Sequence, residues 1–295
     1  MAFSPVAPAW NAAGHRLSAV IAWQQLDEPT RGVAGEILRH HPDHTLWIER
    51  ARKADRNVDE PYAAFVEAST WPDDIRRDHR FYKPGEPETP LLPGFPDMQQ
   101  HQDWHYVNLP VGAYSPRKRP GGALDRQLPL LIERIRQPAQ TKESERAYAL
   151  AWLIHLLGDA HQPLHVGSRI DDSGDDDSGG NALWIENFFH PRRSSMTLHA
   201  YWDDLPGPPW LRGRQLEATA ERLNEHIEQP QQAGNVDQWL SESRKLADTV
   251  AYEGLEGEVP VLSTRYHERA TETARQRVAL AGKRLGLLLK ELLKP

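Results

Sequence analysis

The stretch AWLIHLLGDAHQPLHVG, residues 151–167, carries four titratable side chains within an otherwise apolar run: His155, Asp159, His161 and His165. The apolar residues recur at helical spacing, so the stretch predicts a buried helix that the following proline ends. His155 and Asp159 are four residues apart and therefore lie on one face of that helix. Core helices rarely bury so many polar groups, which indicates a site and not simple packing.

A second pair with the same spacing occurs in TLHAYWDD, where His199 precedes Asp203 by four residues. The chain has no cysteine, which excludes disulfides, thiolate zinc sites and cysteine nucleophiles. A single buried histidine is more often a hydrogen-bonded core residue than a ligand. Two such pairs together with His165 favour a metal site, because burying these groups without a metal ion would cost several kcal/mol. Imidazole and carboxylate together suit zinc.

The composition is that of a globular protein, with 39% hydrophobic and 26% charged residues in a chain of 295. No apolar run approaches the roughly 20 residues of a membrane-spanning helix, so no membrane association is expected. The net charge of −7 argues against a protein that binds polyanions through a basic surface alone. If this chain binds nucleic acid, the attraction has to come from a localised site.

Helical periodicity dominates the sequence and predicts an all-α fold with long loops and at most a short β-hairpin. The predicted helices cover residues 13–27, 30–40, 44–55, 60–69, 124–137, 143–161, 211–228, 236–254 and 264–293. The best strand is ALWIENFF at 182–189, and proline and glycine predict loops at 83–96, 110–122 and 204–213. The metal-ligand candidates extend from residue 15 to residue 203, which favours one mainly helical domain over residues 10–295.

The first nine residues, 1–9, lack both the basic and the apolar region of a complete signal peptide. Ala7-Pro8-Ala9 nevertheless resembles the end of a cleavage site, directly before Trp10. Two interpretations stay open: an untargeted tail, or the end of a signal peptide whose upstream part is missing from this sequence.

Metal binding is an alternative interpretation for two further polar segments, but we favour a loop for both. DDSGDDDSGG at 171–180 has the composition of a calcium loop without its spaced ligands, so we expect a solvated loop. RHHPDH at 39–44 is likewise expected to be a polar loop.

Several motifs occur together and in a fixed order: Trp10-x4-His15, Trp71-x-Asp73, Trp104-His105, His155-x3-Asp159-x5-His165, Gly179-Gly180-Asn181 and His199-x3-Asp203. This set resembles the trinuclear-zinc, single-strand-specific type I nucleases of fungi and plants and their bacterial relatives. The resemblance extends from residue 10 to the terminal AGKRLGLLL helix. It implies the helical fold that these nucleases share with zinc phospholipase C.

The resemblance also implies three zinc ions and their ligands. One ion would be bound by Asp73, His105, His155 and Asp159, and a second by His165, His199 and Asp203. The third would be bound by His15, by Asp159 as a bridge, and by the amine and carbonyl of Trp10. His161 matches no ligand position and is expected either to support a ligand or to lie at the surface.

The implied activity is hydrolysis of single-stranded DNA and RNA to 5′-nucleotides, together with removal of the phosphate from 3′-nucleotides. Asp73 would orient or deprotonate the attacking water, and Arg76 would bind the phosphate. Tyr106 would stack a nucleobase, although a core tyrosine is the competing interpretation. Asn108 stands where fungal members carry an acid that contacts the base, which leaves base preference open. Asn181, after the paired glycines, completes the expected substrate-binding residues.

Two alternatives differ in class from a nuclease. A zinc phospholipase C would be expected to carry a glutamate where this chain has Asp203, and Tyr106 also favours nucleotides. A zinc-binding protein without turnover is disfavoured by Arg76 and by the complete ligand set. We therefore expect a monomeric, secreted or periplasmic enzyme with single-stranded nucleic acid and 3′-nucleotides as substrates.

Overall fold

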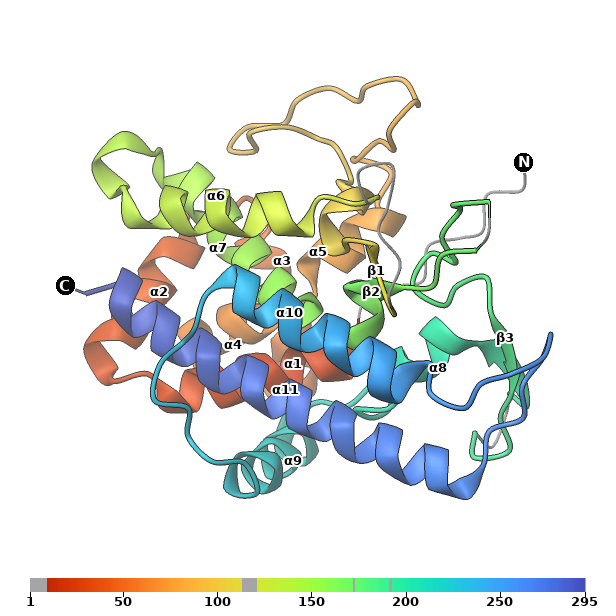
Figure 1. The fold of residues 1–295 in the computed structure, drawn as a ribbon. Coiled ribbons are helices and arrows are strands. Elements are labelled where there is room, and N and C mark those ends of the chain that lie inside the picture. The colour runs from red at the N-terminus through yellow and green to blue at the C-terminus, as the bar shows by residue number, and fades with distance from the viewer. Residues whose placement is uncertain (1–9, 113–120, 172, 191–192, 295) are drawn as a thin grey trace.

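The computed structural model describes residues 10–112, 121–171, 173–190 and 193–294 (Figure 1). The predicted tail, residues 1–9, lies outside the described residues. The structure is mainly helical, which confirms the predicted all-α class. The α-helices are α1 Ala12–Gln25, α2 Glu28–Arg39, α3 His44–Ala54, α4 Glu60–Ala68, α5 Trp71–Asp74, α6 Leu124–Arg136, α7 Glu143–Asp159, α8 Leu198–Asp204, α9 Gly213–Glu225, α10 Val236–Leu246 and α11 Thr264–Leu292.

Short helical turns connect several of these helices. They are the 3₁₀ helices η1 Ile75–Arg77, η2 Gln102–His105, η3 Pro138–Gln140 and η4 Pro163–His165, and the π-helix η5 Ala247–Ala251. The predicted helix 236–254 is therefore divided into α10 and η5. The predicted helix 143–161 ends at Asp159, so His161 follows the helix. Helix α8 carries the second His-Asp pair but lies outside every range predicted as helical.

Two small sheets complete the fold. Strand β3 Trp184–Glu186 pairs antiparallel with β4 Ser195–Thr197. The strand predicted at 182–189 is therefore present but covers only three of those residues, and it forms a short hairpin. Strand β1 Leu109–Pro110 pairs in parallel with β2 Gly167–Ser168, a pairing that the sequence did not predict. It fixes the segment after His105 beside the segment after His165.

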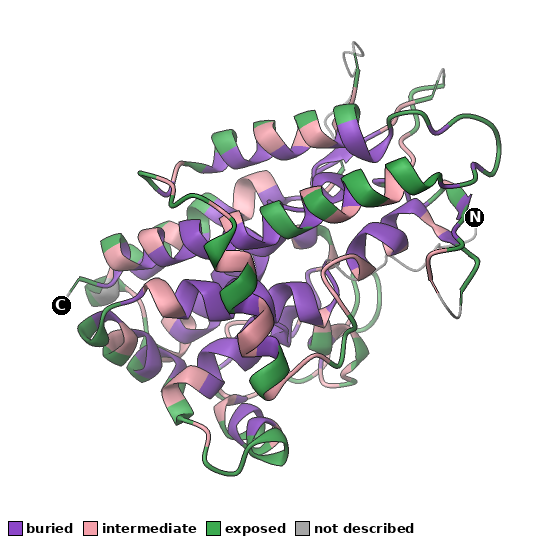
Figure 2. Cartoon of the chain, turned by 90° about the horizontal axis from the view of Figure 1, so that it is seen from below, coloured by how far each residue is buried: buried purple, intermediate pink, exposed green. Residues whose placement is uncertain are grey.

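Helix α7 lies at the centre of the molecule and explains the apolar character of the opening stretch. Every residue from 147 to 159 is buried, so this part of the helix has no solvent-facing side. Figure 2 shows that the buried residues gather in the interior of the molecule, with exposed residues on its outer helices and loops. Its first turn carries Glu143 and Glu145, which interact favourably with the positive end of the helix dipole. Among the described residues, no helix is both long and apolar enough to cross a membrane.

Helices α1 and α11 pack closely along their length (Figure 1). The Asn11 side chain caps α1 by accepting hydrogen bonds from the backbone amides of Ala13 and Gly14. Two glycines of α11 allow the close approach. A methyl group at Gly282 would lie 2.6 Å from the carbonyl oxygen of Ser18, and one at Gly286 would lie 2.6 Å from Cβ of Gln25. The position of α1 is therefore set by the last helix of the described chain.

His161 is fully buried, so the expectation that it could lie at the surface is wrong. Its Nδ1 donates to the carbonyl of Leu157 at 2.8 Å, and its Nε2 accepts a hydrogen bond from Arg284 at 3.1 Å. Among the described residues, the hydrogen-bond partners of the ring include no metal-ligand candidate. The sequence alone could not predict that His161 is buried, because its partner Arg284 lies in α11, 123 residues further along the chain.

Glu242 of α10 joins two arginines of α11 in the same polar network. It accepts hydrogen bonds from Arg277 at 2.9 Å and from Arg284 at 2.7 and 2.8 Å. Arg277 also donates to the carbonyl of His161, and Ser243 donates to that of Ala160. The network therefore fastens α10 and α11 to the chain directly after Asp159.

Replacing Glu242 with alanine is expected to lower the free energy of unfolding by about 3 kcal/mol, because two buried guanidinium groups lose their carboxylate. Burial alone would raise the pKa of Glu242, but its hydrogen bonds with Arg284 and Arg277 lower that pKa from 4.5 to about 2. The unfolded state thus binds the proton more tightly, and the stabilisation is complete above pH 4.5 and is lost as the pH falls towards 2.

Denaturant unfolding of both proteins across this pH range checks the prediction. The difference in stability between wild type and variant should narrow as the pH falls. The matched control is Glu221→Ala on the exposed surface of α9, which should change the stability little. An equal loss in both variants would contradict the role of the network.

Candidate metal centre

The histidines and aspartates singled out in the sequence come from six elements and gather into three groups. The groups are His15 with His155 and Asp159; Asp73 with His105 and His155; and His165 with His199 and Asp203. Within each group the ligand atoms all lie within 4.8 Å of one another. The structure thus brings together every side chain expected to bind zinc, apart from Trp10, whose expected ligands are backbone atoms.

The first two groups adjoin each other around His155 and Asp159. Oδ2 of Asp159 lies 3.1 Å from Nδ1 of His105 and 3.3 Å from Nε2 of His155, and those two ring nitrogens are 3.0 Å apart. Oδ1 of the same carboxylate lies 3.4 Å from Nε2 of His15. One carboxylate therefore faces ligand atoms of both groups, as a bridging ligand would.

The third group has the same dimensions. Nε2 of His199 lies 3.1 Å from Nε2 of His165 and 3.5 Å from Oδ2 of Asp203. Two ligands at about 2.1 Å from a tetrahedral metal ion are roughly 3.4 Å apart. These two separations are close to this value, so the group of His165, His199 and Asp203 has dimensions that suit a metal ion.

Backbone carbonyls fix the orientation of three of the rings. Nδ1 of His155 donates to the carbonyl of Ser69 at 2.7 Å, that of His165 to the carbonyl of His105 at 2.6 Å, and that of His199 to the carbonyl of Gly179 at 2.8 Å. Since a carbonyl can only accept, the proton lies on Nδ1 and the lone pair of Nε2 points into the group. This arrangement is typical of metal-binding histidines.

Several buried polar atoms of the groups have no hydrogen-bond partner among the described residues. They are both ring nitrogens of His15, Nε2 of His105, Oδ1 of Asp159 and Oδ2 of Asp203. A buried polar atom without a partner costs free energy, and native proteins contain few of them. Metal coordination would satisfy the ligand atoms among them, so the residues present fit bound metal ions.

The pKa shifts of three histidines and one aspartate of these groups point the same way. Burial lowers the pKa of His15, His105 and His165 well below the ordinary value, which keeps these rings neutral and able to coordinate. Burial also raises the pKa of Asp203 well above its ordinary value. A buried carboxylate that resists ionisation is stabilised in its charged form by a nearby cation, which a divalent metal ion would supply.

Arg76 follows Asp73 by one helical turn and faces the groups. Its guanidinium lies 3.4 Å from Oδ1 of Asp73, and its side chain is largely buried. Burial is the main cause of the low pKa of His199, and the positive charge of Arg76 lowers it further. Arg76 therefore holds a positive charge at the edge of the centre, where an anionic substrate would meet it.

Trp10 lies two residues before α1, and its side chain is fully buried and packs on Gly14. The amide of the next residue, Asn11, donates to the carbonyl of Asp203 at 3.1 Å. The backbone next to Trp10 is thus anchored beside the group of His165, His199 and Asp203. Coordination by its amine and carbonyl stays a prediction.

The three expected substrate-binding residues lie close in sequence to the metal centre. Tyr106 and Asn108 follow His105, and Asn181 follows Gly179, whose carbonyl accepts a hydrogen bond from His199. Tyr106 is half-buried directly after His105. Asn108 is buried and donates to Asp176 at 2.7 Å, while Asn181 donates to the carbonyl of Ser178 and closes a turn. Their role in substrate binding stays a prediction.

Sequence reasoning missed Gln162, which lies between the histidines of the opening stretch. It is fully buried, its Nε2 donates to Oδ1 of Asp203 at 2.8 Å, and its Oε1 accepts from the amide of Leu164. Gln162 thus holds Asp203 in position against His165 and His199. An isolated glutamine carries no spacing signal, and only the contact between distant segments shows its role.

Replacing Gln162 with leucine is expected to weaken metal binding at the His165 group by roughly 10- to 100-fold, the usual effect of losing a residue that orients a ligand. Titration of the metal-free protein with zinc, followed by calorimetry, would measure this. The control is Gln232→Leu in an exposed loop. Equal zinc affinities in both variants would show that Gln162 does not position Asp203.

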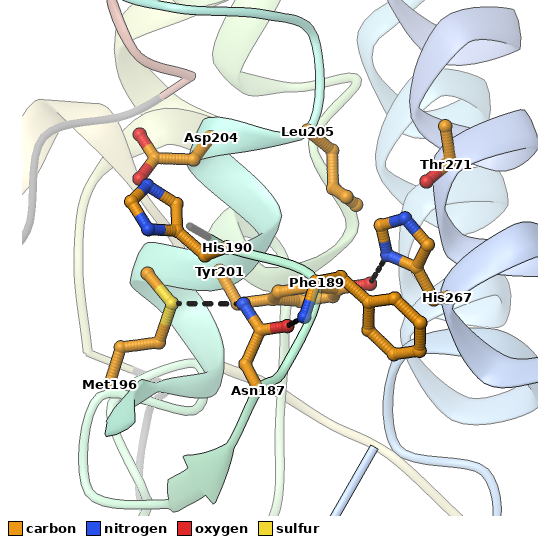
Figure 3. A pocket seen from close by; sticks show the side chains of 9 residues that line it. All are labelled: Asn187, Phe189, His190, Met196, Tyr201, Asp204, Leu205, His267 and Thr271. Atoms are coloured by element: carbon orange, nitrogen blue, oxygen red, sulfur yellow. Dashed lines mark hydrogen bonds between the residues drawn. The ribbon is translucent and has the colours of Figure 1, made fainter. Parts of the chain in front are cut away.

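A cavity of about 230 Å³ lies elsewhere, between the β3–β4 hairpin, α8 and α11 (Figure 3). Phe189 stacks on His267 with ring centres 4.2 Å apart, and the His267 Nδ1 is 2.9 Å from the Tyr201 hydroxyl. Tyr201 and Asp204 of α8 line this cavity, whereas His199 and Asp203 face the third group. One side of α8 therefore lines this cavity, and its other side faces the group of His165, His199 and Asp203.

Comparison with known proteins agrees with this geometry. A family model described as S1/P1 nuclease matches residues 10–294. Endonuclease 1 of Arabidopsis thaliana is 29% identical over 167 residues, which are 50% of this chain and 51% of that protein. The chain thus spans about half the length of this curated relative.

Proposed function

Because the chain belongs to the S1/P1 nuclease family, we propose that it is a zinc-dependent phosphodiesterase acting on single-stranded DNA and RNA. Its products would be 5′-nucleotides, and it would also remove the phosphate from 3′-nucleotides. The observation that carries the proposal is the gathering of buried histidines and aspartates into three groups with the dimensions of metal sites. The name of the Arabidopsis relative, Endonuclease 1, supports a nuclease.

Three zinc ions would be bound per chain. Imidazole with carboxylate is a ligand set that suits zinc, and the chain offers no thiolate. Asp73, His105, His155 and Asp159 would bind one ion, and His165, His199 and Asp203 another. His15 would bind the third with Asp159 as the bridge, which agrees with the separation of 3.4 Å between Nε2 of His15 and Oδ1 of Asp159.

The reaction adds water to the phosphorus and breaks the P–O3′ bond. When bound, the metal ions would lower the pKa of water and neutralise negative charge on the phosphate and the leaving oxygen. Asp73 would orient the attacking water or accept its proton, since it is the partly exposed carboxylate of the centre. Arg76 would bind the phosphate through its guanidinium. A net charge of −7 is compatible with this, because the phosphate would be recognised locally.

The preference for single strands would come from Tyr106. A ring stacks only on a base that is not already stacked in a duplex. Tyr106 is half-buried and follows His105, so its ring can hold a base while the neighbouring phosphate lies at the centre.

Trp10 would contribute its amine and carbonyl to the third ion after residues 1–9 have been removed. Removal of a leader is the processing expected of a secreted or periplasmic protein, and we propose that the chain is one and that it acts as a monomer. Mass spectrometry of the natural protein tests the first point. A retained Met1 together with three bound zinc ions would contradict coordination by the amine.

A direct assay tests the proposed function. The protein should degrade single-stranded DNA and RNA much faster than the duplexes, and chelation should stop this activity. The same preparation should be assayed on phosphatidylcholine, the substrate of a zinc phospholipase C. Hydrolysis of the lipid without hydrolysis of nucleic acid would overturn the proposal, as would zinc binding without turnover of either.

A further inference from the structure

An acidic side chain that the ligand set does not include lies next to the expected base-binding residues. Asp176 belongs to the loop 171–180, and its Oδ1 accepts hydrogen bonds from Nδ2 of Asn108 at 2.7 Å and from the amide of Ser178 at 2.9 Å. Both bonds go to the same oxygen. No hydrogen bond to Oδ2 of Asp176 is formed by any residue that the structure describes.

Asp176, Asn108 and Tyr106 converge on one exposed point of the surface, at Gly121. A methyl group on Gly121 would lie 3.5 Å from Nδ2 of Asn108, 3.9 Å from Oδ2 of Asp176 and 4.0 Å from Cε2 of Tyr106. Gly121 itself is exposed. Burial raises the pKa of Tyr106, and the negative charges of Asp103 and Asp176 raise it further, which agrees with a carboxylate close to the phenol.

The loop that carries Asp176 is held in place at its base. Oδ1 of Asp177 accepts hydrogen bonds from the hydroxyls of Ser168 and Tyr252, each at 2.8 Å, and from the amide of Arg169. The backbone of Asp176 also forms a bridge with Ile170. The position of the carboxylate is thus fixed by contacts with the rest of the protein.

This point lies within reach of the metal centre. Asn108 follows His105 by three residues. Asp176 precedes Gly179 by three residues, and the carbonyl of Gly179 accepts a hydrogen bond from His199. Three residues of extended chain span roughly 10 Å. A nucleotide whose phosphate lies at the centre can therefore place its base between Tyr106 and the Asn108–Asp176 pair.

The pair presents acceptors to such a base. Nδ2 of Asn108 is used by Asp176. Among the described residues none donates to Oδ1 of Asn108 or Oδ2 of Asp176, so both oxygens keep their capacity to accept a hydrogen bond. Of the common bases, guanine alone carries two adjacent donor groups, N1–H and the 2-amino group, on its Watson–Crick edge. Adenine and cytosine offer one amino group beside a ring acceptor, and thymine and uracil offer one N–H between two carbonyls.

We propose that Asp176 is a specificity-determining residue that makes this site prefer guanine at the nucleotide on the 5′ side of the cleaved bond. The inference rests on the proposed nuclease function. A hydrogen bond to a charged group discriminates by about 1.5–3 kcal/mol, so the preference should be at least about tenfold in kcat/KM.

The test uses single-stranded thymidine oligonucleotides that carry one guanine, adenine or cytosine guest. The rate of cleavage directly after the guest is measured against the rate after thymine in the same molecule. Wild type should show a guanine-to-adenine ratio of about ten or more. In Asp176→Asn the ratio should fall to near one, because asparagine can keep Oδ1 as an acceptor but places a donor where Oδ2 stood.

The matched control is Asp175→Asn, which removes the same charge from an exposed neighbour in the loop. It should keep the guanine preference. A loss of folding would lower all rates together and leave the ratio unchanged, so the ratio reports on base recognition alone.

Equal cleavage after all guests by the wild type would overturn this inference and leave the nuclease function intact. A guanine preference retained in Asp176→Asn would do the same. Absence of cleavage of any oligonucleotide by the zinc-loaded protein would overturn both.

Discussion

Replacing Asp159 with asparagine is expected to reduce nuclease activity by at least about 1000-fold, since metal ions contribute several kcal/mol of transition-state stabilisation. The two oxygens of Asp159 face ligand atoms of two metal groups, with Oδ2 3.1 Å from His105 and Oδ1 3.4 Å from His15. Asparagine preserves the shape of the side chain, but its amide nitrogen cannot coordinate. One substitution should therefore disturb two zinc sites at once.

Zinc content per chain, measured by atomic emission, together with initial rates on single-stranded DNA, would check this. We expect the variant to lose zinc from the two proposed sites that Asp159 would bridge and to keep zinc in the group of His165, His199 and Asp203. The control, Asp248→Asn, removes a carboxylate from an exposed position and should keep full zinc content and activity. A variant of Asp159 with unchanged zinc content would refute the bridging assignment.

Removing the metal ions should lower the unfolding temperature by at least roughly 10 °C. A single ion that binds only the folded chain, present at 1000 times its dissociation constant, already stabilises it by about 4 kcal/mol. For a chain of this size, each kcal/mol corresponds to about 2–4 °C. The physical reason lies in the buried ligand atoms without partners on His15, Asp159 and Asp203, which would again be unsatisfied in the metal-free protein.

Calorimetric unfolding before and after chelation, and again after zinc is restored, measures the effect. Magnesium should restore little, because it prefers oxygen ligands in an octahedral arrangement. Treatment with zinc-saturated chelator controls for effects of the chelator itself. An unfolding temperature that chelation leaves unchanged, in a protein shown to have lost its zinc, would mean that the three groups do not couple metal binding to folding.

The sequence alone predicted those parts of the metal centre whose residues lie close together in the chain. His155 with Asp159, and His199 with Asp203, are four residues apart and occupy one face of a helix, so spacing alone singled them out. His15 and His105 have no comparable neighbours and were selected only through the family resemblance. The structure places them at the centre because α1 and η2 pack around the end of α7.

Features that depend on contacts between distant segments were not predicted. The composition of residues 171–180 predicts only a solvated loop, whereas the hydrogen bond between Asp176 and Asn108 joins residues 68 positions apart. The parallel pair β1–β2 consists of two residues on each side, too short for an alternating pattern. His161 is buried because Arg284, 123 residues later, satisfies its ring nitrogen.

The close contact between α1 and α11 has a consequence for the order in which the enzyme is made. Gly282 and Gly286 hold α11 against the helix that carries His15, yet α11 is synthesised after every ligand candidate. Until α11 has been synthesised, α1 lacks the surface that fixes its position. We therefore expect the group that contains His15 to reach its final geometry only after α11 has formed and packed against α1.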